Sequence, residues 1–357
     1  MTSSNVRAPA ARKRVGIALN RLTKERYYGQ DSVRRLERGV EVAWLEFDGP
    51  ARATEEKPGD REKLAAFVRD LDALVVSHGC PRVTADIIAG APRLKFIGDT
   101  HGDRFAERID IEAARKAGIS VVDTTNGSSD PVAEWALAMA MIGLRNAGAL
   151  FRRLIAGELL WPDRRVFEHD PGYLVGELTG KTVGMIASGH VGRKLLELLE
   201  PFHCDVLVYD PHAPAVLAEI YDLNLTSLDN VMSRTDVVIC LAPLTAETRG
   251  LIGREQVENM RAGTVFVNVS RGMVVQTAPL VERLERGDII ACLDVFDPEP
   301  IPVDHVVRRL PNVFLTPHIA GVTAACEPRF FDYMVDEVLR ALAGHRPRHE
   351  LIPREPN

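Results

Sequence analysis

The chain has 357 residues, too many for one ordinary hydrophobic core and enough for two domains. Its 46% hydrophobic and 26% charged residues are typical of a soluble globular protein, which we expect in the cytoplasm. The formal charge of −6 disfavours nucleic acid as a partner, and no apolar stretch approaches the roughly 20 residues of a membrane span.

The N-terminal segment, residues 1–14, is rich in Arg, Ser, Ala and Pro. It lacks the apolar core of a secretory signal, so we interpret it as a frayed tail, with an organellar transit peptide as the alternative. The chain also has five dispersed cysteines: Cys80, Cys204, Cys240, Cys292 and Cys326. Their spacing does not suit a metal and fits a reducing compartment, so we interpret them as structural and expect no metal site.

From residue 15 onward, short apolar runs alternate with segments of helical period. The expected strands are residues 15–19, 40–47, 73–76, 94–97 and 119–122. The expected helices between them include residues 62–70 and 111–117. This alternation predicts a parallel sheet that is covered by helices on both faces.

A longer helix is expected over residues 131–145, with Pro131 in its first turn. It is apolar nearly all round, which indicates burial between domains, between subunits or in an ordinary core. A second alternating series then follows an irregular stretch. Its expected strands are residues 182–187, 205–209, 237–241, 264–268, 289–293 and 313–315. Two series predict an α/β fold of two doubly wound parallel-sheet units, Rossmann-like or flavodoxin-like.

The second series opens with a strand-to-helix turn of the kind that binds dinucleotides. Gly189 and Gly192 occupy the second and third glycine places of the fingerprint, whereas Ala187 stands in the first. The next strand ends at Asp210, 18 residues beyond Gly192, where an acid can bind the adenosine ribose hydroxyls. A carboxylate there would repel a 2′-phosphate, so the turn favours NAD over NADP. The alternative is a plain glycine turn with a solvated aspartate.

Three polar motifs follow, each at the end of an expected strand. They are residues 268–272 (Asn-Val-Ser-Arg-Gly), 294–300 (Asp-Val-Phe-Asp-Pro-Glu-Pro) and 316–321 (Thr-Pro-His-Ile-Ala-Gly). Because ligands of open α/β sheets gather at the carboxyl ends of strands, these motifs can converge on one site. An arginine can grip a carboxylate, and an acid/base group can move the hydroxyl proton of a 2-hydroxy acid. Any one of these residues alone has a plainer interpretation as a surface or core side chain.

In these motifs the chain resembles the D-isomer-specific 2-hydroxyacid dehydrogenases, roughly from residue 94 to the C-terminus and most densely over residues 180–321. The resemblance implies an NAD-dependent oxidoreductase that moves a hydride between NAD(H) and a small 2-hydroxy or 2-oxo acid. It implies that Arg271 binds the substrate carboxylate and polarises the 2-oxo group, that His318 is the acid/base and that Glu299 pairs with His318. A carboxylate beside the imidazole would also fix the orientation of the ring.

The same resemblance implies which residues bind the cofactor and the substrate. The cofactor set is Gly189, His190, Val191, Gly192, Asp210, Leu241, Ala242, Pro243, Val269, Arg271, Asp294, His318, Ala320 and Gly321. Within it, Asp294 is expected on the nicotinamide carboxamide. The substrate set is Gly102, Arg271 and His318.

The loop at residues 98–108 departs from the family pattern, because it is longer and more charged than the usual glycine-rich loop. Gly102 is the expected stand-in for the carboxylate-binding position. We hypothesise that His101 or Arg104 reaches a second polar or anionic group on the substrate, with a solvated loop as the alternative. Gln276 stands where the family often has an acid, and the sequence gives no functional reason for it.

Three alternatives remain open. Formate dehydrogenases share the scaffold but resemble a version with glutamine at the place of Glu299. A phosphite-oxidising relative keeps all three catalytic residues. Transcriptional corepressors keep the fold, the cofactor and the three residues but resemble a pattern with a tryptophan soon after the histidine, which residues 319–327 lack; an NAD(H)-binding sensor on the same fold belongs to this alternative.

The expected organisation is a substrate domain of residues 1–125 and 323–357 and an NAD-binding Rossmann domain of residues 126–322, with a cleft between them. By resemblance we expect hinge closure and a homodimer through the helix at 131–145. The sequence does not specify the acid, the direction in the cell or whether NADP is also used.

Overall fold

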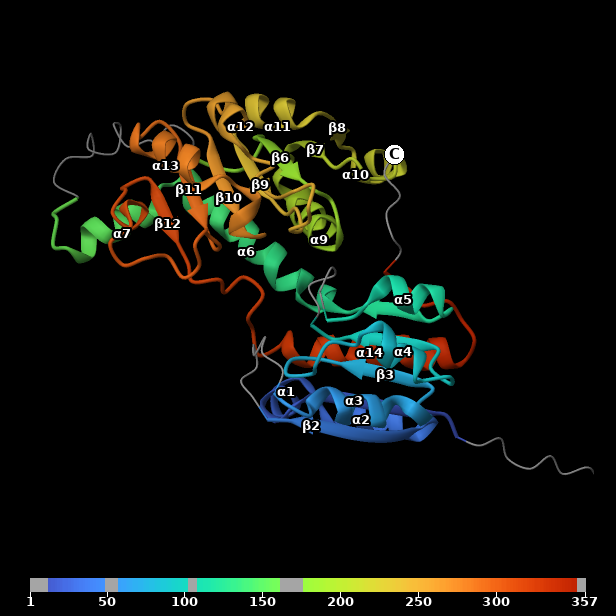
Figure 1. Ribbon diagram of the computed structural model, residues 1–357. Coiled ribbons are helices and arrows are strands. Elements are labelled where there is room, and N and C mark those ends of the chain that lie inside the picture. The colour runs from blue at the N-terminus through green and yellow to red at the C-terminus, as the bar shows by residue number, and fades with distance from the viewer. Residues whose placement is uncertain (1–11, 49–56, 102–107, 161–175, 352–357) are drawn as a thin grey trace, which may run out of the picture. The chain divides into compact units, whose positions relative to one another are not determined.

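A computed structural model of the protein describes residues 12–48, 57–101, 108–160 and 176–351. The chain divides into unit 1, Met1–Ser128 with Ala324–Asn357, and unit 2, Ser129–Thr323. Each unit is built on a parallel sheet with helices on its faces, which confirms the expected fold class (Figure 1). Within the described residues, no helix combines the length and the apolar character needed to cross a membrane.

Unit 1 holds a five-stranded parallel sheet in the order β2-β1-β3-β4-β5. Its strands are β1 (Arg14–Asn20), β2 (Glu41–Phe47), β3 (Ala73–Val76), β4 (Phe96–Asp99) and β5 (Ser120–Asp123). Its helices are α1 (Arg21–Tyr27), α2 (Gln30–Gly39), α3 (Asp60–Phe67), α4 (Ala85–Ala89), α5 (Ile111–Lys116) and α14 (Glu327–Leu342), with 3-10 turns η1 (Val68–Asp70) and η2 (Thr125–Ser128). This strand order is that of a flavodoxin-like sheet.

Alternate residues of each strand point to opposite sides of the unit 1 sheet. Helices bury both of these sides. Ile17 and Val75 pack with α2 and α14 on one face. Ala18 and Val76 pack with α3, α4 and α5 on the other. The near-continuous apolar strands of the sequence are thus the signature of a sheet that is covered on both sides.

Unit 2 holds a seven-stranded parallel sheet in the order β12-β11-β10-β9-β6-β7-β8. Its strands are β6 (Thr182–Ile186), β7 (Asp205–Tyr209), β8 (Asn224–Leu225), β9 (Val237–Cys240), β10 (Val265–Asn268), β11 (Ile290–Leu293) and β12 (Val313–Leu315). Its helices are α6 (Ser129–Leu144), α7 (Ala147–Ile155), α9 (His190–Leu199), α10 (Val216–Tyr221), α11 (Leu228–Arg234), α12 (Arg254–Asn259) and α13 (Thr277–Glu285), with 3-10 turns η4 (Glu200–Phe202), η5 (Gly272–Val274) and η6 (Val306–Arg308). The order is that of a Rossmann sheet with one added edge strand.

Two apolar clusters bury the faces of the unit 2 sheet. Val237 and Ile239 of β9 lie in the cluster with α6 and α9, and Val238 lies in the opposite cluster with α11, α12 and α13 (Figure 1). Helix α6 runs close to the strands: a Cβ on its Gly143 would lie only 2.4 Å from Val265 Cγ1, so the contact requires glycine. The apolar side chains of α6 therefore pack largely within unit 2, against α9, β10 and β11.

Candidate functional site

The site begins where the direction of winding reverses in unit 2. Strands β6 and β9 are neighbours, although β7 and β8 lie between them in the sequence. The chain leaves β6 on one side and β9 on the other, so their carboxyl ends form the crevice in which open α/β sheets bind ligands. The turn after β6 carries Gly189, and the loop after β9 carries Leu241, Ala242 and Pro243.

The turn after β6 has the geometry of a dinucleotide-binding turn. Gly189 caps α9, and a Cβ at this position would meet nothing within 4 Å, so the space beside it is open. A Cβ on Gly192 would lie 3.0 Å from Ala187 O, so glycine is needed there for close packing of the helix on the strand. Helix α9 begins at His190 and includes Val191, and its N-terminus attracts an anion such as a pyrophosphate.

Asp210 is fastened to this turn. Its Oδ2 accepts hydrogen bonds from the backbone N–H and the hydroxyl of Ser188, at 2.8 and 2.9 Å. Its Oδ1 accepts the N–H of His212 at 2.9 Å. The carboxylate thus lies beside the glycine turn at the end of β7, and the turn, helix and acid fit the phosphates and ribose of a dinucleotide.

The loop after β10 holds Arg271 through its own side chains and backbone. Asn268 Oδ1 accepts the N–H and the hydroxyl of Ser270, at 3.0 and 2.9 Å, and Asn268 Nδ2 donates to Arg271 O at 3.3 Å. Val269 is buried in this turn, and Arg271 Nη1 donates to Ser270 O at 2.7 Å. The asparagine of the Asn-x-x-Arg motif therefore stabilises, through its side-chain hydrogen bonds, the turn that carries the arginine.

Gly272 joins this loop to the next one. A Cβ at Gly272 would lie 2.1 Å from the backbone C and O of Phe296, so only glycine allows the contact. Phe296 belongs to the segment that leads from β11 to Glu299. The Arg271 and Glu299 loops are thus packed against each other at the carboxyl edge of the sheet.

Glu299 and His318 form a direct pair. His318 Nδ1 lies 2.6 Å from Glu299 Oε1, and their side chains are 30% and 41% exposed. The two residues also line a hollow of about 270 Å³ next to Asp294. The pairing fixes the orientation of the imidazole and leaves Nε2 as the ring nitrogen that can face a substrate.

Asp294 is hydrogen-bonded to the loop that carries His318. Its carboxylate, 2% exposed, accepts hydrogen bonds from Thr316 Oγ1 at 2.6 Å and from the N–H groups of Ile319 and Ala320, each at 2.9 Å. Asp294 therefore holds the loop that carries His318. To bind a nicotinamide carboxamide as well, the Asp294 carboxylate would have to accept a further hydrogen bond besides these three.

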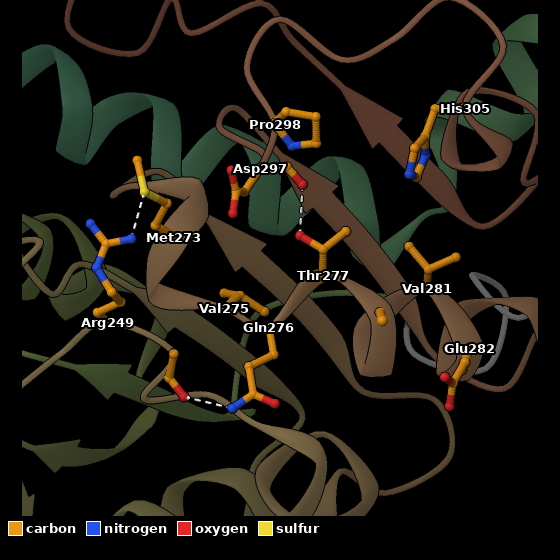
Figure 2. Close-up of a pocket in the computed structure, with 12 residues that line it drawn as sticks. Arg249, Met273, Val275, Gln276, Thr277, Val281, Glu282, Asp297, Pro298 and His305 are labelled. Atoms are coloured by element: carbon orange, nitrogen blue, oxygen red, sulfur yellow. Dashed lines mark hydrogen bonds between the residues drawn. The ribbon is translucent and has the colours of Figure 1, made fainter.

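Gln276 has a structural role that the sequence did not reveal. Its side-chain Nε2 donates to Gly250 O at 3.3 Å, and its backbone N–H donates to Ile252 O at 2.9 Å, so it ties the loop before α12 to the start of α13. Figure 2 shows it on the wall of an open hollow of about 650 Å³. On the same wall Thr277 Oγ1 donates to Asp297 O at 2.7 Å, which supports the segment before Glu299.

Of the residues expected to contact substrate from unit 1, Gly102 and Arg104 lie outside the described residues. His101 follows β4, and its ring centroid lies 4.5 Å from that of His78, which follows β3. Phe330 of α14 lies beneath His101, with centroids 5.1 Å apart. Sequence reasoning missed His78, although its position directly after a buried strand was the signal that could have found it.

A glycine turn at the switch point of a Rossmann sheet defines a dinucleotide-binding unit. Residues 137–320 match the family model described as D-isomer specific 2-hydroxyacid dehydrogenase, NAD binding domain. The chain belongs to the D-isomer-specific 2-hydroxyacid dehydrogenase family, and its cofactor is NAD.

Similar proteins come from distant organisms. The chain is 34% identical to the D-3-phosphoglycerate dehydrogenase of Methanocaldococcus jannaschii over 80% of its own length and 52% of that protein. It is 33% identical to the glyoxylate reductase of Thermofilum pendens over 81% and 84%. The apo D-mandelate dehydrogenase structure from Rhodotorula graminis shares the fold, with a TM-score of 0.77, 20% identity and coverage of 96% and 98%.

The chain thus spans about half the length of the phosphoglycerate dehydrogenase relative, 52%, and most of the glyoxylate reductase, 84%. The dehydrogenases for which the family is named carry out NAD-dependent hydride transfer between 2-hydroxy and 2-oxo acids.

Proposed function

We propose that this protein is an NAD-dependent 2-hydroxyacid dehydrogenase in which His318 is the acid/base, Glu299 orients it and Arg271 binds the substrate carboxylate. The observation that carries the proposal is the 2.6 Å contact between His318 Nδ1 and Glu299 Oε1. It supports a histidine that is held for proton transfer in a family that moves hydrides.

NAD(H), when bound, accepts or supplies the hydride at C2 of the acid. In the direction of reduction, protonated His318 gives its Nε2 proton to the carbonyl oxygen, so one hydride and one proton convert a 2-oxo acid to a 2-hydroxy acid. In oxidation the neutral ring takes that proton back. Glu299 orients the ring through Nδ1, and the contribution of such acid/base help is about 10²- to 10⁴-fold in rate.

Arg271 is the group that can bind the substrate carboxylate. A planar guanidinium matches a carboxylate with two parallel hydrogen bonds, and the same charge polarises a neighbouring 2-oxo group. Gly189, Asp210 and the N-terminus of α9 are proposed to hold the adenosine and pyrophosphate of the cofactor. We further propose that Asp210 selects NAD over NADP, because its carboxylate would repel a 2′-phosphate.

The test is a substrate panel with purified protein and NADH, and in parallel NADPH, followed by loss of NADH absorbance. The panel is glyoxylate, hydroxypyruvate, pyruvate, phenylpyruvate, 2-oxoglutarate and oxaloacetate; formate and phosphite are tested with NAD. We expect turnover of at least one 2-oxo acid with NADH, and a fall of at least about 10²-fold in His318→Ala. NADH binding in that variant, read by fluorescence, is expected to persist.

Other outcomes decide among the alternatives. Turnover of formate or phosphite alone would reassign the reaction, and tight NADH binding without turnover of any compound would favour a sensing protein. The glutamate at position 299 argues against formate, whose oxidation has no hydroxyl proton to move.

His101 is proposed to contribute to the choice of substrate. The half-buried imidazoles of His101 and His78 offer hydrogen bonds at the carboxyl edge of the unit 1 sheet. We expect His101→Ala to change the ratios of kcat/KM across the panel; the same fold-change for every acid would contradict this role.

A further inference from the structure

His318 has a backbone conformation that needs external support. Its φ is 56°, in the left-handed region that glycine normally occupies, although its side chain is indispensable to the proposed reaction. A non-glycine residue stays in this region when the surrounding structure dictates it. What holds the loop of residues 316–320 therefore decides where the imidazole lies.

The buried Asp294 brackets His318 from both sides. Its carboxylate bonds to Thr316, two residues before the histidine, and to the N–H groups of Ile319 and Ala320, one and two residues after it. The backbone adds a further contact, because His318 N donates to Asp294 O at 2.8 Å. Removal of the Thr316 hydroxyl would take away the only side-chain bond to Asp294 that is described on the N-terminal side of His318, while the backbone bond of Thr316 N to Leu293 O at 3.0 Å would stay.

Asp294 and Trp135 are consistent with one direction of the Thr316 hydroxyl, because a carboxylate can only accept a hydrogen bond and an indole N–H can only donate one. The indole Nε1 of Trp135 lies 3.4 Å from Thr316 Oγ1, and an indole N–H can only donate. The hydroxyl oxygen is thus the acceptor toward Trp135, and its own proton goes to Asp294 Oδ1 at 2.6 Å. The three side chains therefore form two consecutive hydrogen bonds: Trp135 of α6 donates to Thr316, and Thr316 donates to Asp294.

We infer that Thr316 is a positioning residue for the reaction proposed above: fixed by Trp135 and bonded to Asp294, it keeps His318 in its left-handed conformation with Nδ1 on Glu299. This inference rests on the proposed function for its kinetic consequence. The arrangement of the loop itself does not depend on which compound is turned over.

The experiment compares Thr316→Val, which keeps the shape and removes the hydroxyl, with Thr316→Ser, which keeps the hydroxyl. Thr316→Val is expected to lower kcat about 10- to 100-fold, as displacement of a catalytic group by about 1 Å does, while KM for the 2-oxo acid changes less than about threefold. Thr316→Ser is expected to stay within about threefold of the wild-type kcat. Trp135→Phe, which removes only the indole N–H donor, is expected to give a smaller loss of about two- to tenfold.

Thr235→Val is the matched control. Thr235 is buried in the same unit and its Oγ1 donates to Val231 O at 2.7 Å, far along the sequence from the 316–320 loop. Thr235→Val should leave kcat within about twofold, which separates loss of a buried hydroxyl in general from loss of this one. The inference is overturned if Thr316→Val keeps the wild-type kcat, or if Thr316→Ser is as impaired as Thr316→Val.

A spectroscopic readout separates this inference from the proposed function. The side-chain ¹⁵N signals of His318, assigned by their loss in His318→Gln, report the hydrogen bond of Nδ1 to Glu299 without any substrate. We expect these signals to shift in Thr316→Val and to return in Thr316→Ser. If the wild type turns over no 2-oxo acid but the signals behave in this way, the proposed reaction fails and the positioning role stands; unshifted signals in Thr316→Val overturn the positioning role.

Discussion

Two residues of the candidate site, Ala187 and His318, have left-handed backbone conformations, with φ of 76° and 56°. His318 is bracketed by bonds to Asp294, and its imidazole cannot be exchanged without loss of the proposed chemistry. Ala187 is different, because it stands at the first glycine place of the dinucleotide turn and its side chain is a single methyl group. The strain at Ala187 is therefore a cost that a substitution can remove.

Ala187→Gly is expected to stabilise unit 2. A left-handed conformation costs an alanine about 1–2 kcal/mol in the folded state, and glycine avoids this cost. The greater conformational entropy of glycine in the unfolded chain offsets part of the gain. We expect the free energy of unfolding to rise by about 0.5–1 kcal/mol, with NADH affinity unchanged or improved. Thermal unfolding with and without NADH measures both.

Gly192→Ala serves as the opposing variant in the same turn. Its Cβ would lie 3.0 Å from Ala187 O and 3.3 Å from Met185 Cε, so it should weaken both stability and NADH binding. A lower midpoint for Ala187→Gly than for the wild type would show that the turn does not carry the strain described here.

At the same scale, local motifs were predictable and distant partners were not. The sequence indicated Arg271, Glu299 and His318 because each follows a buried strand in a recognisable motif, and the structure joins Glu299 to His318. The contribution of Trp135 was invisible, since 181 residues separate it from Thr316. The assignment of the catalytic roles remains a proposal.

Buried central strands were the most predictable elements. β9 and β10 coincide with contiguous apolar runs, whereas β8 was missed because its two residues, Asn224 and Leu225, are exposed and carry no pattern. The expected strand at 94–97 was shifted: β4 begins at Phe96 and runs to Asp99. Leu94 N donates to Ala91 O at 3.1 Å, so a turn occupies the first positions of that apolar run.

The C-terminal segment is an element whose attachment we expect to depend on pH. It adds an antiparallel edge to β5, where Leu351 N donates to Val121 O at 2.8 Å. Glu337 of α14, 1% exposed, anchors it by accepting the Arg348 N–H at 2.8 Å and by its 3.0 Å contact with His349 Nδ1.

Burial raises the pKa of Glu337, but the hydrogen bonds with His349 and Arg348 outweigh burial and hold the pKa below its ordinary value of 4.5. A lowered pKa in the folded state means that the anchor contributes its full stability above about pH 4.5 and loses it as the pH falls through the lower folded value. The difference in unfolding free energy between wild type and Glu337→Gln should therefore shrink as the pH falls below about 4.5. Urea unfolding at several pH values measures it, and a constant difference would refute the anchor.

At the scale of the whole molecule, we propose that the protein is a homodimer. Large apolar side chains on and after α7 are exposed, including Phe151 at 61%, Ile155 at 67% and Leu159 at 80%. Phe151 and Ile155 are four residues apart and so share one face of α7, and exposed apolar side chains on one face are typical of a surface that a partner covers.

The double variant Phe151→Glu/Ile155→Glu is expected to shift the protein from dimer to monomer in light scattering after gel filtration. Burial of charge in an apolar interface is the reason, and NADH binding should survive because the glycine turn lies elsewhere in unit 2. Val303→Glu, at another exposed apolar position, is the control and should not change the mass. A wild-type protein that is monomeric at micromolar concentration would contradict the dimer.

In the proposed reaction a hydride passes from NADH to C2 of a 2-oxo acid, and His318 supplies the proton. NADH with deuterium at the transferred position of C4 is reacted with the best 2-oxo acid of the panel, and the product is examined by mass and chiral analysis. The expected product is a 2-hydroxy acid that carries one deuterium at C2, in the D configuration, and His318→Ala is expected to form it at least about 10²-fold more slowly. A product without deuterium at C2, or formation of the deuterated product by His318→Ala at the wild-type rate, would show that the reaction is not the one proposed.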